Sequence, residues 1–438
     1  MSRSQNVPAS PPRAAAPAKA TPEEELSYYD FAELSQKVAK RPLVLFFGRP
    51  TFSDNTKYLF LATAKAAIGC EVVWCTFSKT LAETLRKHRL PCFDVTADVR
   101  KSCNLFLEAA VAVFCENPAA ALSLNAMFSG CLAGAQKLQL WHGVSVKHLD
   151  LMLIPHLEIR DAAFRRQLRF ATRVDHFLST SSAVDGFWAR AFGARSLLRA
   201  GQPRNEVLVR PPTAAEMIGA ELPPAQVELL RKSAKKKVLM APTQNRDNVL
   251  YVTTTAFYER LKKWARANDA VVFVKAHPAM KAAHTSGQDA AAIITEEAGV
   301  LHVLDPEIDV YPWLVCFDAL ITDYSSIMFD FLLLRRPIFT YDTRTQFPQS
   351  VDPDYTLIPA TPFRYEFTQE NFETIVNASL AVHPLRASQE KLAGELFETP
   401  ASDACAQLVR TLVELGTQAV DRSYTVITPR PAAISRAA

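Results

Sequence analysis

The sequence lacks any paired arrangement of cysteines. Its eight cysteines are spread from residue 70 to residue 405, and no two of them form a Cys-X-X-Cys pair. Several lie in apolar runs such as AVAVFCE (110–116), which is typical of buried free thiols. This spacing argues against a disulfide framework and against a zinc site, and it favours a reducing, cytoplasmic compartment.

A strong net charge is also missing. The chain has 49 Lys and Arg against 45 Asp and Glu, a formal net charge of only +4. A dedicated nucleic-acid-binding protein carries a stronger basic footprint, so we predict no nucleic-acid partner. Hydrophobic residues make up 49% of the 438 positions, enough to fill the cores of two domains of ordinary size.

No segment has the pattern of a membrane span or a secretory signal. The longest uncharged stretch, 117–136, is interrupted by Pro118 and several polar residues, so we predict a buried helix there. The first 22 residues are rich in Pro, Ala and Ser and contain no apolar signal core. We predict a disordered tail there and another at the TPRPAAISRAA end.

Short apolar runs alternate with helical patterns from residue 42 onward, which is typical of βα units and a parallel sheet. The first series of expected strands is 43–48, 70–77, 109–115, 138–143 and 176–181. The second series is 237–243, 271–278, 301–305, 319–326 and 337–342. We therefore predict an α/β fold with two Rossmann-like domains facing a cleft.

The expected organisation has five parts. They are a disordered tail and lead-in (1–38), a first Rossmann-like domain (39–205), a linker with a covering helix (206–236), a second Rossmann-like domain (237–418) and a tail (419–438). Ligands of such sheets bind just beyond the carboxyl ends of the strands, so the residues at those ends are the candidates for function.

In the second half, DALITDYSSIMFDFLLL predicts a strand, a polar turn opened by Asp323 and an apolar helix. Ser325 and Ser326 fall at the expected start of the helix, where backbone N–H groups suit a phosphate or diphosphate. The alternative is that the serines only cap the helix. Asp330 interrupts the apolar helix, so its carboxylate must be paired or must face a polar ligand such as a ribose.

Two other strand ends of this half carry residues suited to an anion. Lys275 and His277 alternate in KAHP and therefore point to the same side. APTQNRD ends its strand with Thr243 and Arg246, both suited to a diphosphate. The only Asp-X-Asp motif, DPD (352–354), lies in a predicted loop, so we predict neither a metal site nor a cofactor.

In the first half, Ser53, Asp54 and Asn55 follow the opening strand and either cap the next helix or line the cleft. His142 ends a later strand, followed by Gly143, which gives the backbone room to turn, and by Lys147. A strand-end histidine is either structural or catalytic. The anion-binding pattern of the opposite domain favours the catalytic role.

These residues together resemble the CDP-glycerol glycerophosphotransferase family, the teichoic-acid polymerases and primases and their capsule-building relatives. WHGVSVK is similar to the family's WHG-X-X-X-K segment, GQPRNEVL to its G-X-PRND turn, and APTQNRD to its APT-W-RD strand end. KAHP resembles K-X-HP, and DVYPWLVCFDALITDYSSIMFDFLLLRRPIFTYD resembles the D-X-Y…LITDYSS…FD-LLL-KP signature. The ordered set extends from about residue 43 to 345.

The resemblance implies a GT-B type fold and transfer of an alditol phosphate from CDP-glycerol or CDP-ribitol. It makes His142 the general base on the acceptor hydroxyl and His277 a second essential histidine near the donor diphosphate. The expected donor site contains Arg246, Thr243, Lys275, Asp309, Tyr311, Asp323, Ser325, Ser326 and Asp330. The expected acceptor side or cleft contains Lys147, Ser53, Asp54, Asn55, Arg204 and Asn205.

The sequence departs from the family in two places. Gln244 and Asn245 precede Arg246 where the family has an aromatic residue, and YTLIPATPFRYE replaces an acidic–aromatic segment. These changes leave the alditol and the acceptor open. The expected acceptor is a growing polymer or a lipid-linked oligomer at the inner face of the cytoplasmic membrane, which the enzyme would contact peripherally. The alternatives are a GT-B glycosyltransferase that uses a nucleotide sugar and a catalytically silent scaffold.

Overall fold

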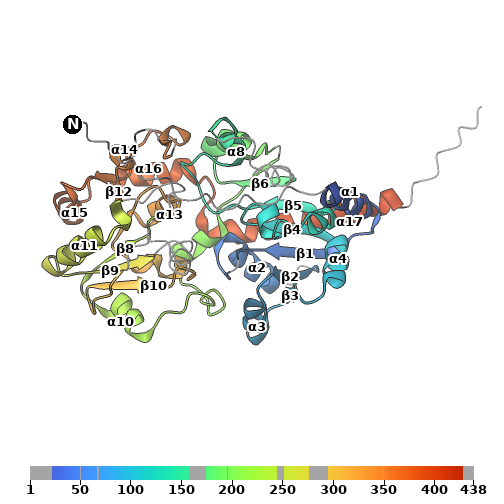
Figure 1. The fold of residues 1–438 in the computed structure, drawn as a ribbon, viewed down its shortest axis with the longest axis horizontal. Helices are drawn as coiled ribbons and strands as arrows, with labels where there is room; N and C mark the ends of the chain where they lie inside the picture. The colour runs from blue at the N-terminus through green and yellow to red at the C-terminus, as the bar shows by residue number, and fades with distance from the viewer. Residues whose placement is uncertain are drawn as a thin grey trace, which may run out of the picture.

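The fold consists of two parallel β-sheets with flanking helices (Figure 1). The computed structural model describes residues 22–427 except 50, 67–68, 157–173, 195, 244–250, 276–293, 347, 349 and 351. The predicted α/β fold with two Rossmann-like domains is therefore confirmed. Arg246, His277 and most of both predicted tails lie outside the described residues.

The first sheet has seven strands in the order β3-β2-β1-β4-β5-β6-β7. Their bounds are β1 Arg41–Phe47, β2 Glu71–Thr76, β3 Cys92–Asp94, β4 Ala109–Phe114, β5 Gln136–Gln139, β6 His176–Ser179 and β7 Leu197–Arg199. Its helices are α1 Pro22–Lys37, α2 Asp54–Ala66, α3 Lys79–Lys87, α4 Val99–Glu108, α5 Pro118–Ala121, α6 Ala126–Cys131 and α8 Asp185–Phe192. The middle strands β1 and β4 are buried on both faces, as their continuous apolar sequences require.

The second sheet has six strands in the order β10-β9-β8-β11-β12-β13. Their bounds are β8 Lys236–Met240, β9 Ala270–Lys275, β10 Leu301–Leu304, β11 Ala319–Thr322, β12 Ile338–Tyr341 and β13 Tyr365–Phe367. Its helices include α11 Thr255–Ala267, α13 Ile327–Phe331, α14 Thr343–Gln346, α15 Phe372–Ala381 and α16 Arg386–Leu396. Every pairing between named strands in both sheets is parallel.

The stretch 117–136 differs from the single buried helix that we predicted. It contains α5 and α6, because Ser123 and Leu124 between them have positive φ angles of 55° and 57°. The side chain of Asn125 accepts a hydrogen bond from the Phe128 backbone N–H and begins α6 anew. Within the described residues, every helix is too short or too polar to cross a membrane.

The predicted linker contains α9 (Glu206–Val209) and α10 (Pro224–Lys232), preceded by a 3₁₀ turn at Pro203–Asn205. After the second sheet, α17 (Ala404–Ile427) packs on the first sheet beside α2, β1 and β4 (Figure 1). Leu408 and Leu412 are fully buried there. The boundary that we predicted at residue 419 therefore falls inside α17.

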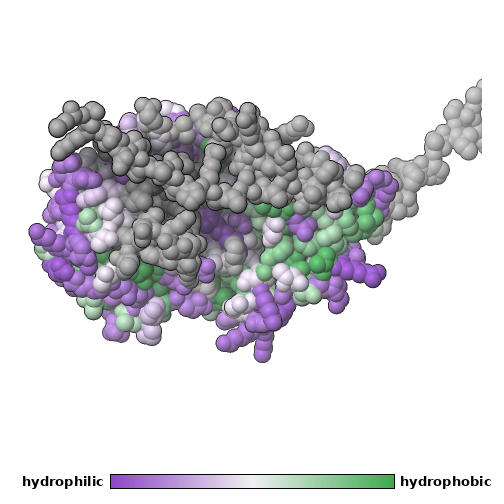
Figure 2. Space-filling view, viewed as in Figure 1, coloured by the Kyte–Doolittle hydropathy of each residue, from purple (hydrophilic) through white to green (hydrophobic). Residues whose placement is uncertain are grey.

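The two domains differ in the hydropathy of the surface that Figure 2 shows. Polar residues cover most of the exposed second domain, whereas apolar residues gather near the end formed by α1, α4 and α17. Tyr29, Leu34 and Val99, which belong to α1 and α4, are 53%, 43% and 51% exposed. This end of the first domain is thus the more apolar one.

The packing of α17 predicts the effect of Leu412→Ala. We expect this variant to lose about 2–5 kcal/mol of unfolding free energy, because it leaves a cavity between α17 and the first sheet. The midpoint of thermal unfolding of the first domain measures the loss. Val382→Ala is the matched control, since Val382 is 68% exposed and its truncation should change stability by less than about 0.5 kcal/mol. Equal melting curves for both variants would contradict the placement of α17.

Candidate functional site

A cleft of about 420 Å³ lies between the two domains, at the carboxyl ends of strands from both sheets. Its first-domain wall contains Arg49, Thr51, Ser53, Asp54, Glu116, Trp141, His142, Gly143, Ser145, Lys147, Leu149 and Arg204. Its second-domain wall includes Thr243, Lys275, Asp309, Tyr311, Ser325 and Ser326. The predicted cleft and most of its predicted residues thus come together in one place.

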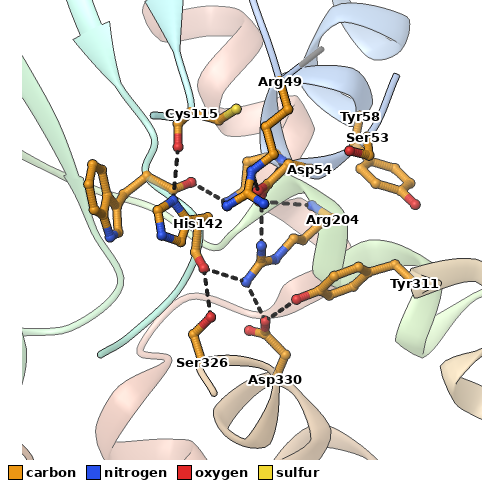
Figure 3. Close-up of polar contacts among 12 residues, drawn as sticks. Arg49, Ser53, Asp54, Tyr58, Cys115, His142, Arg204, Tyr311, Ser326 and Asp330 are labelled. Carbon is orange, nitrogen blue, oxygen red and sulfur yellow. Dashed lines mark hydrogen bonds and ion pairs between the residues drawn. The ribbon is translucent and has the colours of Figure 1, made fainter. Parts of the chain in front are cut away.

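His142 lies just beyond β5, on the first-domain wall (Figure 3). Its ring stacks on Trp141 at a centroid distance of 4.3 Å, and its Nδ1 is 3.3 Å from the Cys115 carbonyl oxygen. A carbonyl oxygen only accepts hydrogen bonds, so this contact requires the proton on Nδ1. Nε2 then carries the lone pair, and it has no protein partner in the part of the chain that the structure describes.

The surroundings of His142 keep its imidazole neutral. Burial lowers its pKa to about 3, and Arg49 and Arg204 add to this effect, while Asp54 opposes it. A group with this pKa is unprotonated throughout the neutral range. The side chain is therefore uncharged at neutral pH, so it does not bind an anion by charge.

Gly143 allows the turn after His142. Its φ angle is +107°, and a Cβ atom there would lie 2.6 Å from Nη2 of Arg204 and 3.2 Å from Cβ of Ser326. Only glycine tolerates both the angle and the contact. The His142 carbonyl accepts hydrogen bonds from the same two side chains, at 2.9 Å from Arg204 and 3.0 Å from Ser326.

Arg204 is the centre of a buried network that joins the domains (Figure 3). Its Nη1 donates to Asp54 at 2.7 Å, its Nη2 donates to Asp330 at 2.6 Å, and its guanidinium lies 4.5 Å from the ring centroid of Tyr311. Burial disfavours the charge, but Asp330, Tyr311 and Asp54 outweigh it, so the pKa of Arg204 is raised. Arg204 therefore stays charged and fixes the relative position of the two walls.

Asp330 is fully buried. Of the two alternatives, a carboxylate paired within the protein or one that faces a polar ligand, the structure shows the pairing. Besides Arg204, it accepts hydrogen bonds from Asn205 at 2.9 Å and from the Tyr311 hydroxyl at 2.7 Å. Its carboxylate is thus occupied by protein groups. Asn55 is occupied in the same way: it donates to the Trp141 carbonyl at 2.9 Å and accepts from the Arg204 backbone N–H at 3.2 Å.

Asp309 is held by two residues that sequence reasoning missed. Lys57 and Tyr58, both in α2, each donate to Asp309 at 2.7 Å, and all three side chains are almost completely buried. This is a second bridge between the domains. The available signal was Lys57 directly before the apolar run YLFLA, because a lysine that such a run buries needs an acidic partner.

On the second-domain wall, Asp323 organises the strand ends. Its carboxylate accepts hydrogen bonds from the backbone N–H groups of Thr243, at 2.8 Å, and of Tyr324, at 2.5 Å. Ser326 precedes α13 but its side chain makes no cap bond, since it bonds to the His142 carbonyl instead. The simple capping role therefore does not apply to Ser326.

Lys275 lines the cleft at the end of β9. Its Nζ donates to the Pro306 carbonyl at 2.8 Å. Burial lowers the pKa of Lys275 to about 8, helped by Arg49 and opposed by Asp309 and Asp305. Because Arg49 and Lys275 repel each other, an anion bound between the two side chains would stabilise the charged form of Lys275.

Two further predicted residues, Lys147 and Ser53, also line the cleft. The ammonium of Lys147 is 5.0 Å from the ring centroid of Tyr324, and Ser53 Oγ is 2.8 Å from Thr51 Oγ1. In the DPD segment, Asp352 accepts from the His148 backbone N–H at 2.8 Å. The described residues contain no group of three or more side chains placed to hold a metal ion.

Sequence reasoning also missed Arg49 and Glu116, which follow β1 and β4 and line the cleft beside His142. Arg49 Nε lies 3.5 Å from Asp54 Oδ2. The signal was their position, since both follow apolar strands just as His142 does.

The sequence matches the model of one protein family. The sequence model of "CDP-Glycerol:Poly(glycerophosphate) glycerophosphotransferase" matches residues 29–347. Among curated relatives, a teichoic acid poly(glycerol phosphate) polymerase of Staphylococcus epidermidis is 25% identical over 73% of this chain and 43% of its own length. A teichoic acid glycerol-phosphate transferase of Staphylococcus aureus is 27% identical over 47% of this chain and 52% of its own. The chain thus spans about half the length of these relatives.

Among solved structures, the wall teichoic acid polymerase TagF is similar in fold. The two superpose with a TM-score of 0.66 at 17% sequence identity, over 90% of this chain and 94% of the other. This likeness supports the two-domain architecture predicted from the sequence.

The buried network predicts that Asp330→Asn is strongly destabilising. The variant leaves Arg204 with one fewer compensating charge inside the protein, and breaking such a pair costs about 3–5 kcal/mol. Urea unfolding followed by tryptophan fluorescence measures the loss. Asp30→Asn on the exposed face of α1 is the control with the same change of charge, and we expect less than about 0.5 kcal/mol. Equal stability of the two variants would show that Arg204 does not depend on Asp330.

Proposed function

The chain belongs to the CDP-glycerol:poly(glycerophosphate) glycerophosphotransferase family, and from this premise we propose its reaction. The protein transfers glycerol phosphate, or another alditol phosphate, from a CDP-activated donor to a hydroxyl group of a growing surface polymer and releases CMP. One observation carries the proposal: the neutral His142, with Nε2 unoccupied by the described residues, faces a wall that presents Lys275, Ser325 and Ser326 across the same cleft.

In the proposed reaction, His142 is the general base. Its Nε2 takes the proton of the acceptor hydroxyl, and the oxygen attacks the phosphorus that carries the alditol. A new P–O bond forms while the bond to the CMP oxygen breaks, and the electron pair leaves with CMP. The Nδ1–H bond to the Cys115 carbonyl holds the ring in the tautomer that this role requires.

The donor diphosphate lies against the second-domain wall. Lys275 compensates its charge, and Thr243 and Ser325 line the same strand ends. His277 and Arg246, which lie outside the described residues, join this site on the strength of the family motifs. Asp323, Asp309, Tyr311 and Asp330 act indirectly, because hydrogen bonds and ion pairs within the protein occupy their polar groups.

The alditol is glycerol in the name of the family and in the names of several relatives, while other relatives are named ribitol-phosphate polymerases. We propose CDP-glycerol as the donor and a polymeric or lipid-linked acceptor. A solved structure of TagF is described as soaked with CDPG, which supports this choice. The apolar end of the first domain, with exposed Tyr29 and Val99, supports peripheral contact with the inner face of the cytoplasmic membrane.

The first test is CMP release by the purified protein. We expect release from CDP-glycerol that depends on a glycerol-phosphate-primed acceptor, and a loss of about 10²–10⁴-fold in kcat for His142→Ala. His88→Ala, which changes an exposed histidine at the end of α3, should keep full activity. Release only from UDP-sugars would make the protein a glycosyltransferase instead, and silence with CDP-glycerol, CDP-ribitol and UDP-sugars alike would refute transfer.

The pH dependence gives a second test. Because the pKa of His142 is lowered to about 3, kcat/KM should show no loss near pH 6.5, where an ordinary histidine becomes protonated. Because the pKa of Lys275 is about 8, kcat/KM for the donor should fall above that pH as the ammonium loses its proton.

Lys275→Met should lower donor kcat/KM at neutral pH and abolish the alkaline decline. An alkaline decline that persists in this variant would assign it to another group. A decline on the acid side near pH 6.5 would contradict the neutral state of His142.

A further inference from the structure

Two charged side chains on the first-domain wall take little or no part in the buried networks. Glu116 makes no side-chain hydrogen bond or ion pair in the part of the chain that the structure describes. Arg49 makes a single long contact, 3.5 Å to Asp54, and its Nε is buried without a hydrogen-bond partner. Both side chains line the cleft, and no ion pair within 4.0 Å joins them to each other. They therefore remain available to a ligand.

The sheet topology places these two residues next to the proposed base. β1, β4 and β5 are adjacent in the first sheet, and Arg49, Glu116 and His142 follow them in that order. Cys115, whose carbonyl faces Nδ1 of His142, directly precedes Glu116. Glu116 and His142 thus come from neighbouring strand ends and line one wall (Figure 3 shows Arg49, Cys115 and His142).

Charge decides which substrate these residues contact. A carboxylate repels the diphosphate of the donor, whereas it accepts hydrogen bonds readily from hydroxyl groups. A guanidinium binds a phosphate by paired, charge-assisted hydrogen bonds. A carboxylate and a guanidinium at neighbouring strand ends of one cleft wall therefore match a molecule that carries hydroxyl groups next to a phosphate.

We propose that Glu116 and Arg49 form the acceptor subsite, in which Glu116 accepts a hydrogen bond from a hydroxyl group of the terminal polyol and Arg49 binds the phosphate that links this polyol to the rest of the acceptor. The subsite rests on the proposed function, because it orients the hydroxyl that His142 deprotonates. It also restricts the acceptor to a polyol phosphate end group.

The lack of a protein partner for Glu116 agrees with a role in binding. Burial raises the pKa of this carboxyl group, as does Asp54, while Arg49 opposes the change. A partly buried carboxylate without a hydrogen-bonding partner lowers stability, so its removal should not harm the fold. Glu116→Gln should therefore melt at the wild-type temperature or above it, which a structural carboxylate would not do.

The kinetic test measures KM separately for acceptor and donor with the full-length protein. We expect Glu116→Gln to raise the acceptor KM by about 10-fold, because a neutral hydrogen bond replaces a charge-assisted one, and Arg49→Gln to raise it by about 10- to 100-fold. The KM for CDP-glycerol should change less than about threefold. Glu307→Gln is the matched control, because it removes one exposed carboxylate from the opposite wall, and the acceptor KM should stay within about twofold.

An unchanged acceptor KM in Glu116→Gln, or an equal rise in Glu307→Gln, would overturn the subsite. Binding of glycerol 3-phosphate, followed by ligand-observed NMR, tests it without turnover. We expect binding to the wild type and loss of binding in both subsite variants; binding that the variants retain, or none to the wild type, would overturn the proposal. Wild-type protein that binds glycerol 3-phosphate yet releases no CMP would refute the proposed function alone.

Discussion

The structure depends on one buried cation held between two carboxylates. Arg204 bonds Asp54 of the first domain and Asp330 of the second, and it also bonds the carbonyl of the residue proposed as the base, His142. A buried charge is stable only when it is paired, so removal of either Arg204 or Asp330 would leave the other charge buried without compensation. The ion pairs thereby set the distance between the two walls, and the Lys57–Asp309 bridge repeats the arrangement nearby.

The charged and titratable side chains of the cleft fall into two sets: those paired within the protein, and those that remain for a substrate. Asp54, Asp309 and Asp330 are occupied by cations of the protein, so their carboxylates do not repel an incoming diphosphate at full strength. His142 and Lys275 both have lowered pKa values, because burial and neighbouring cations disfavour their charged forms. His142 is therefore neutral, and it faces a wall on which Lys275 loses its positive charge near pH 8.

Much of the fold was predictable, because parallel strands buried on both faces are continuous apolar runs. All ten expected strands are present within a few residues of their predicted positions. The missed strands β3, β7 and β13 have three residues each, too short for a periodic pattern. The break between α5 and α6 and the return of α17 to the first sheet were missed, since left-handed residues and long-range packing leave no periodic signal.

The sequence by itself determined which residue types stand at the strand ends, and therefore where the cleft lies and that a histidine faces Lys275 and two serines across it. It also placed Asp330 within an apolar helix, which requires a partner or a ligand. Only the tertiary structure decided between a partner and a ligand, because the cationic partners of Asp330 and Asp309 lie 126 and 252 residues away in the chain. Periodicity reports the face of an element on which a side chain lies, whereas the pairing of a buried charge depends on which elements fold against it.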